Sequence, residues 1–217
     1  MDEPARLFVL RHGQTAWNAE QRIQGHLDLP LNGVGRWQAE RLADALHGEE
    51  LAAIYSSDLQ RACETAAPLA RRRQMPVHTD QGLRERAFGS FEGCTFQDIE
   101  QRWPEEAGRW RRRDPHFGPG GGETLADFSA RCLASAVRLA REHAGQAIAL
   151  VAHGGVLDCL YRAALGIELQ APRTWAVANA TVNRLLWTPQ GLSLVLWNDT
   201  AHLQALPGDE PPPADTP

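Results

Sequence analysis

The sequence of 217 residues contains no lysine, and all 22 of its basic residues are arginine. A chain without lysine cannot form a Schiff base with a carbonyl substrate, and it cannot build a Walker-type phosphate loop. The formal net charge is −5, and this mild acidity disfavours a general binder of nucleic acid or of membrane surfaces. The absence of lysine and the acidic balance therefore exclude several classes of site and partner.

Cysteine is also scarce, and long apolar runs are missing. The four cysteines are widely spaced and form no C-x-x-C pair, so neither a zinc knuckle nor a thioredoxin-like site is indicated. No stretch approaches the roughly 18 consecutive apolar residues of a membrane-spanning helix. The first ten residues, "MDEPARLFVL", are acidic, and their apolar run is too short for a signal peptide. We expect free thiols and a location in the cytoplasm.

Apolar patterning predicts strands and helices in alternation. The expected strands cover residues 6–10, 52–57, 147–153, 181–187 and 192–198, and the expected helices cover residues 33–47, 59–73, 123–144 and 154–165. Such alternation favours a layered α/β domain with a largely parallel sheet. Residues 114–123 are predicted to form a loop, and the segment 83–122, which is rich in aromatic residues, matches neither pattern well.

The expected domain covers residues 1–206, and residues 207–217 are predicted to be a disordered tail. That tail, "GDEPPPADTP" with the proline before it, is rich in proline and acid and has no apolar residue larger than alanine. Such a segment cannot bury enough surface to offset the entropy lost on ordering.

Cationic side chains follow three of the predicted strands, at the point where each strand ends. Arg11 and His12 come directly after the first strand, Arg61 follows the second through a turn, and His153 follows "IALVA". In open α/β sheets, ligands bind at the carboxyl ends of the strands. We therefore expect these four side chains to meet at one place, although each alone would be read as a solvated or loop residue.

These residue types point to a phosphoryl group as the ligand. The planar forks of two arginines match phosphate or carboxylate oxygens, and a neutral histidine can act as a nucleophile. No lysine and no cluster of aspartates accompanies them, so we expect neither a metal site nor magnesium-assisted transfer. His12 could accept the phosphoryl group directly as a phosphohistidine.

Seven segments in the same order resemble the histidine phosphatase superfamily, whose members are phosphoglycerate mutase-like proteins with an RHG motif. They span residues 6 to about 203 and read "LRHGQTAWN", "RIQGHLDLPLNGVGRWQAERLADAL", "IYSSDLQRACETA", "LRERAFGSFEG", "GGETLADFSAR", "ALVAHGG" and "WNDTAHL". The resemblance implies a three-layer α/β/α fold with a mostly parallel central sheet. It also implies that residues 83–122 form a small helical cap.

The resemblance implies a role for each matching residue. His12 would be the phosphorylated nucleophile, Arg11 and Arg61 would clamp the phosphoryl oxygens, and His153 would stabilise their charge. Glu85 would be the proton donor to the leaving group, a role that a phosphate ester requires. Asn18 would bind the phosphoryl group. The weaker candidates for substrate contacts are Thr15, Arg22, Gln24 and Gly154.

Three functions fit this pattern. The features "FGSFEG" and "GGET" resemble the phosphatase branch of this family, which implies a metal-independent phosphomonoesterase that acts on small phosphorylated metabolites without a cofactor. The alternatives are a mutase dependent on 2,3-bisphosphoglycerate and a non-catalytic binder of phosphorylated ligands. The basic cluster Arg109–Arg113 could grip an anionic substrate or could be a solvated helix face, with the solvated face preferred. We expect no nucleic-acid or membrane partner, and the oligomeric state, with a homodimer as one option, stays open.

Overall fold

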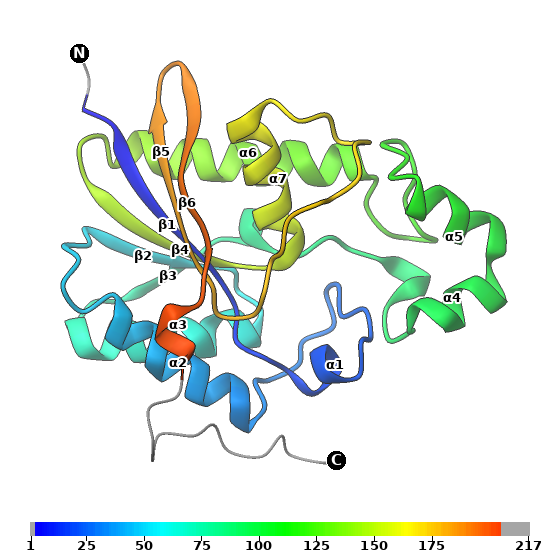
Figure 1. Ribbon diagram of the computed structural model, residues 1–217, viewed down its shortest axis with the longest axis horizontal. Helices are drawn as coiled ribbons and strands as arrows, with labels where there is room; N and C mark the ends of the chain where they lie inside the picture. Colours follow the sequence, from blue (N-terminus) through cyan, green and yellow to red (C-terminus); the bar gives the residue numbers. More distant parts are fainter. Residues whose placement is uncertain (1–2, 205–217) are drawn as a thin grey trace.

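The computed structural model describes residues 3–204 and builds them around a six-stranded sheet (Figure 1). The strand order is β3-β2-β4-β1-β5-β6. The strands are β1 (Ala5–Arg11), β2 (Ala53–Ser56), β3 (Val77–Thr79), β4 (Ala147–Ala152), β5 (Val182–Thr188) and β6 (Gly191–Asp199). The predicted tail, residues 207–217, lies outside the described residues.

The central strand β1 is buried on both faces because its side chains alternate between two cores. Leu7 and Val9 belong to a cluster with residues of the helices α6 (Leu125–Glu142) and α7 (Gly154–Leu165). Phe8 and Leu10 belong to a second cluster, with residues of α2 (Gly33–Ala45) and α3 (Gln60–Arg73). A strand with apolar residues at consecutive positions is therefore covered on both sides. The predicted three-layer α/β/α arrangement is confirmed.

The sheet is mixed, with its parallel strands on one side. β3, β2, β4 and β1 run parallel, whereas β5 pairs antiparallel with β1 and β6 pairs antiparallel with β5. The prediction of a mostly parallel sheet holds for these four strands. The sequence did not predict β3, because it has only three residues and all of them are at least partly exposed.

The helices of the two covering layers begin and end close to the predicted positions. The long helix α6 starts at Thr124, whose Oγ1 accepts a hydrogen bond from the Asp127 N–H at 3.1 Å. Thr124 is therefore the N-cap of α6. None of the helices within residues 3–204 is long and apolar enough to cross a membrane.

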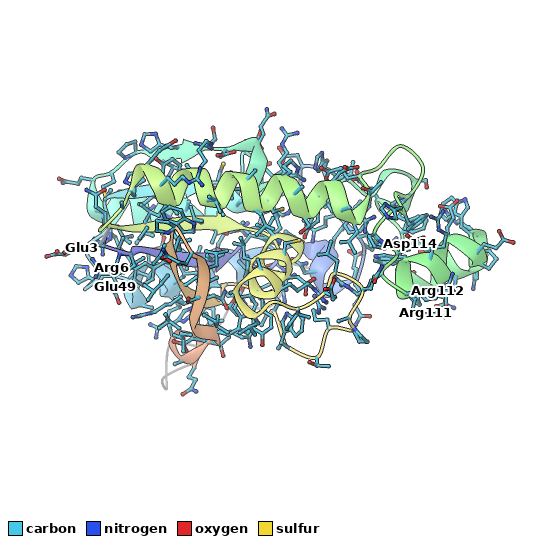
Figure 2. The ribbon with its side chains drawn as sticks, turned by 90° about the horizontal axis from the view of Figure 1, so that it is seen from above. Glu3, Arg6, Glu49, Arg111, Arg112 and Asp114 are labelled. Carbon is cyan, nitrogen blue, oxygen red and sulfur yellow. The ribbon has the colours of Figure 1, made fainter. Side chains whose placement is uncertain are left out.

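Residues 83–122 form a small helical lobe beside the sheet, referred to below as the cap (Figure 1). It contains the short helices α4 (Phe96–Arg102) and α5 (Pro104–Arg111) and the 3-10 turn η2 (Gly89–Phe91). Its own core gathers around Phe91, whose ring lies 5.6 Å from Trp103 and 5.7 Å from Trp110. Figure 2 shows Arg111 and Arg112 at this end of the molecule.

The remaining short elements are α1 (Ala16–Ala19), η1 (Gln81–Leu83) and η3 (Ala201–Leu203). The predicted loop 114–123 contains no helix or strand and lies between α5 and α6.

Candidate active site

The end of β1 places Arg11 and His12 beside the end of β4. Arg11 pairs in register with Ala152, and the His12 N–H donates to the Ala152 carbonyl at 2.9 Å. His153 is the next residue after Ala152, and the His12 and His153 ring centroids are 5.1 Å apart. The next residue, Gly13, has no room for a side chain because the chain passes close to α2 there. A Cβ at Gly13 would lie 2.5 Å from the Gly35 carbonyl oxygen.

Arg61 reaches the same place from the first turn of α3. Its side chain is 1% exposed. Nη1 donates to the Leu27 carbonyl at 2.9 Å and Nη2 to the Gly25 carbonyl at 2.8 Å. These two bonds hold the guanidinium group rigidly without neutralising its charge.

The charges of Arg61 and Arg11 act on both imidazole rings of the cluster. The pKa values of His12 and His153 lie well below the ordinary value of 6.5, first because of burial and second because of the charge of Arg61. Burial also lowers the pKa of Arg11 to about 10, and the nearby Glu85 carboxylate opposes that shift. Both imidazoles are therefore neutral at neutral pH, between two guanidinium groups.

Several buried nitrogens of this cluster have no hydrogen-bond partner within the described part of the chain. They are Nε of Arg11, Nε of Arg61 and both ring nitrogens of His153. Buried polar groups are normally satisfied, since each unpaired one costs about 1–3 kcal/mol. Unpaired donors from three elements, two of them charged, define a site that an anion with several oxygens would satisfy.

The hydrogen bond at Nδ1 determines the tautomer of His12. Nδ1 lies 2.7 Å from the carbonyl oxygen of Gly13. A carbonyl oxygen only accepts, so Nδ1 carries the proton and the lone pair is on Nε2. The ring therefore presents an unprotonated nitrogen, as a nucleophile must.

Glu85 reaches the cluster from the segment between η1 and η2, at the start of the cap. Its Oε2 accepts from the Gly155 N–H at 3.0 Å, and its Oε1 accepts from the Arg86 N–H at 2.9 Å. Gly155 is in the first turn of α7, directly after His153 and Gly154. The start of α7 thus brings the predicted proton donor close to the cluster.

Asn18 and Thr15 support the loop after His12. Thr15 is the N-cap of α1, and Asn18 Oδ1 accepts from the Thr15 N–H at 3.0 Å. Asn179 was not predicted, yet its Nδ2 donates to the His12 carbonyl at 3.0 Å and contacts Asn18 Oδ1 at 3.2 Å. It lies in the loop between α7 and β5, where the sequence has no motif that could have revealed it.

The other predicted contact residues lie at different places. Arg22 is bound to the Glu20 carboxylate at 2.7 Å and to the Gly93 carbonyl at 2.9 Å, so it ties α1 to the cap. Gln24 is 8% exposed, and its Oε1 has no partner among the described residues. Gly154 is close to the cluster, since a Cβ there would lie 3.5 Å from Arg11 Nε.

A cavity of about 750 Å³ adjoins the cluster, and Arg11, Glu85 and Gly154 are part of its lining. His12, Arg61 and His153 are at most 3% exposed and do not line it. The rest of the wall comes from the cap, α6, α7, the loop before β5, and Gln21 and Ile23 after α1. Its volume is typical of a small-molecule site.

No group of three or more His, Cys, Asp or Glu side chains within residues 3–204 is arranged to hold a metal ion. The charged groups near the cluster include guanidinium groups and the carboxylates of Glu85, Asp28 and Glu92.

Residues 7–200 match the histidine phosphatase superfamily (branch 1). Phosphoglycerate mutase-like protein 4 of Arabidopsis thaliana is 40% identical, over 92% of this chain and 87% of that protein. The metal-independent phosphoserine phosphatase of the same plant is 35% identical, over 94% and 85%. The solved structure of YhfR from Bacillus stearothermophilus superposes with a TM-score of 0.86 at 32% identity, over 92% of this chain and 100% of that chain.

The chain therefore belongs to branch 1 of the histidine phosphatase superfamily. It is a phosphoric monoester hydrolase, and its partner is a small-molecule phosphate ester.

Proposed function

We propose that the protein hydrolyses phosphate monoesters through a phosphohistidine on His12, without a metal ion. The observation that carries this proposal is the cluster of Arg11, Arg61 and His153 around His12, with buried donors left unpaired. Phosphoryl transfer requires positioning and neutralisation of charge rather than extensive covalent chemistry by the protein. The guanidinium groups supply that neutralisation.

In the first step, the lone pair on His12 Nε2 attacks phosphorus, and the bond between phosphorus and the ester oxygen breaks. Glu85, as the carboxylic acid, gives its proton to the departing alkoxide. Arg11, Arg61 and the His153 N–H donate hydrogen bonds to the phosphoryl oxygens. Asn18 still has its Nδ2 group for the same purpose, because its Oδ1 faces Thr15 and Asn179.

In the second step, water attacks the phosphohistidine. The Glu85 carboxylate accepts the proton from this water, the bond between phosphorus and Nε2 breaks, and inorganic phosphate leaves. His12 returns to the tautomer with its proton on Nδ1, held by the Gly13 carbonyl. The balance is one ester and one water converted to one alcohol and one phosphate.

The leaving group occupies the cavity between the cap and α7, because Arg11 and Glu85 line it. Metal independence is supported by the arginine cluster and by the 35% identity to a metal-independent phosphoserine phosphatase. The predicted location in the cytoplasm is supported by four free cysteines.

Hydrolysis of p-nitrophenyl phosphate by wild type and His12→Ala tests this proposal. Wild type should release phosphate at the same rate with and without EDTA, and the variant should lose at least about 1,000-fold in kcat because no nearby group can replace the covalent acceptor. Radiolabelled substrate should leave an acid-labile label on wild type but not on the variant. Near-normal turnover by His12→Ala would refute the covalent route.

A second candidate is a phosphoglycerate mutase, because the 40% identical plant relative is named mutase-like. A mutase returns the phosphoryl group to a retained intermediate and must exclude water. Incubation with 3-phosphoglycerate and a trace of 2,3-bisphosphoglycerate separates the two activities. A phosphatase releases free phosphate, whereas rapid formation of the 2-phospho isomer without free phosphate would establish the mutase.

A further inference from the structure

The cavity beside the cluster has a strongly positive lining. Five arginines contribute to its wall, against the carboxylates of Glu85 and Asp158. The chain as a whole carries a net charge of −5, so this excess of positive charge is local. A phosphate monoester brings one dianionic group, which the buried cluster binds. The additional cations on the wall therefore need another explanation.

Two of the cavity arginines already form ion pairs with carboxylates. Arg113 Nη2 donates to Asp158 Oδ2 at 2.7 Å, and the same oxygen accepts from Arg162 Nε at 3.0 Å. Arg111 forms an ion pair with Glu100 on α4. The basic cluster Arg109–Arg113 was expected to form a solvated helix face. Arg109 and Arg112 are exposed, as expected, whereas Arg113 lines the cavity.

Arg86 and Arg173 line the cavity without a carboxylate ion pair to any described residue. Arg86 is 4% exposed, and it donates to the carbonyls of Glu123 and Phe117 at 3.0 and 2.5 Å. These carbonyls orient its guanidinium group but leave its net charge. Arg173 is exposed and makes no side-chain hydrogen bond within the described part of the chain.

Arg173 is on the loop between α7 and β5, and the backbone of this loop is anchored nearby. The Trp175 ring stacks on Tyr161 with centroids 4.2 Å apart, and the Trp197 Nε1–H donates to the Ala176 carbonyl at 2.9 Å. Arg173 is also close enough to Arg11 for their like charges to interact unfavourably. An anion between them would turn this repulsion into attraction.

We propose that Arg173, on the same cavity wall as the charged Arg86, binds a second anionic group carried by the leaving group of the substrate. The substrate class is then a phosphate monoester whose alcohol also bears a carboxylate or a further phosphate. This inference rests on the proposed phosphatase function. It assigns selectivity to residues outside the phosphoryl cluster, which consists of Arg11, His12, Arg61 and His153.

Two matched pairs of esters test the inference. The first pair is 3-phosphoglycerate and glycerol 3-phosphate, which differ by a carboxylate. The second is fructose 1,6-bisphosphate and fructose 6-phosphate, which differ by a phosphate. The selectivity ratio is kcat/KM for the more anionic ester divided by that for its partner. In Arg173→Gln this ratio should fall about tenfold for one pair, as expected for loss of one charge-assisted hydrogen bond.

Arg112→Gln is the matched control, because Arg112 is an exposed arginine of the cap that does not line the cavity (Figure 2). Its ratios should equal those of wild type, and Arg173→Lys should recover part of the loss.

A fall confined to the glycerate pair identifies a carboxylate, and a fall confined to the fructose pair identifies a second phosphate. Unchanged ratios in active Arg173→Gln overturn this inference alone. Failure of wild type to hydrolyse any ester, p-nitrophenyl phosphate included, overturns the phosphatase function as well.

Discussion

At the scale of single residues, the proposed mechanism depends on the neutrality of His12. Burial, Arg61 and Arg11 lower its pKa well below 6.5, while the hydrogen bond to Gly13 opposes this shift. A protonated ring has no lone pair on Nε2 and cannot attack phosphorus. In the free protein, the nucleophile should therefore become active at a pH well below 6.5 and stay active above it.

Nitrogen-15 NMR of the imidazole ring can measure this directly. We expect the His12 signals of free wild type to show the neutral form, with its proton on Nδ1, at pH 6.5 and for some distance below it. Inorganic phosphate should raise the pKa, since a bound anion offsets the charges of the two arginines. His12→Gln identifies the signals. A ring that is half protonated at pH 6.5 in the free protein would contradict this account.

The same scale shows which site residues could be predicted from the sequence. Arg11, His12 and His153 could be predicted because each directly follows a strongly apolar strand, and parallel neighbours end at one edge. Asn179 and Arg173 could not, because they belong to a loop whose path depends on packing of Trp175 and Trp197. Neither residue stands in a local pattern that distinguishes it from a surface side chain.

At the scale of elements, the start of α7 joins the phosphoryl cluster to Glu85, the proposed proton donor. His153 is its N-cap residue, and Gly155 in its first turn donates its N–H to Glu85. A Cβ at Gly155 would collide with the Glu85 carboxylate and would lie 3.0 Å from the Phe128 ring. Gly155→Ala should therefore displace Glu85 while leaving Arg11, His12 and Arg61 in place.

The expected effect of Gly155→Ala depends on the leaving group. Alkyl phosphates need protonation of the departing oxygen, so kcat/KM should fall about 100-fold. p-Nitrophenolate leaves without a proton, and its ester should lose far less. Gly48→Ala is the control, since nothing lies within 4 Å of a Cβ there. Equal losses for both kinds of ester would show that Gly155 acts on the phosphoryl cluster instead.

Elements of the two covering layers could be predicted because their apolar residues repeat over several turns, as in the 18-residue α6. The resemblance implied a helical cap, but its individual helices could not be located, because α4 has seven residues and α5 has eight, which is too short for a clear period. The cap helices pack through aromatic contacts such as that between Phe91 and Trp110. Such contacts join residues that are not neighbours in the sequence and leave no local pattern.

At the scale of the whole molecule, the buried histidines couple stability to pH. The pKa values of His12 and His153 are lowered in the folded state from the ordinary 6.5 of an unfolded chain. Below pH 6.5 the unfolded chain therefore binds protons that the folded protein does not, and the free energy of unfolding decreases as pH falls. Each histidine contributes at most about 1.4 kcal/mol per pH unit within this window.

Thermal unfolding from pH 7 to about pH 5 tests this coupling, because two such histidines give a slope of up to about 2.7 kcal/mol per pH unit. The thermal midpoint should fall steadily below pH 6.5, and His153→Gln should show a shallower slope because one group is removed. Saturating phosphate should raise the thermal midpoint at every pH. At a phosphate concentration of 100 times Kd, the free energy of unfolding should increase by about 2.7 kcal/mol. Phosphate should also flatten the slope, since the bound anion favours the protonated rings in the folded state. A midpoint that is independent of pH in this range would mean that the two rings titrate normally in the folded protein, and the electrostatic description of the cluster would then be wrong.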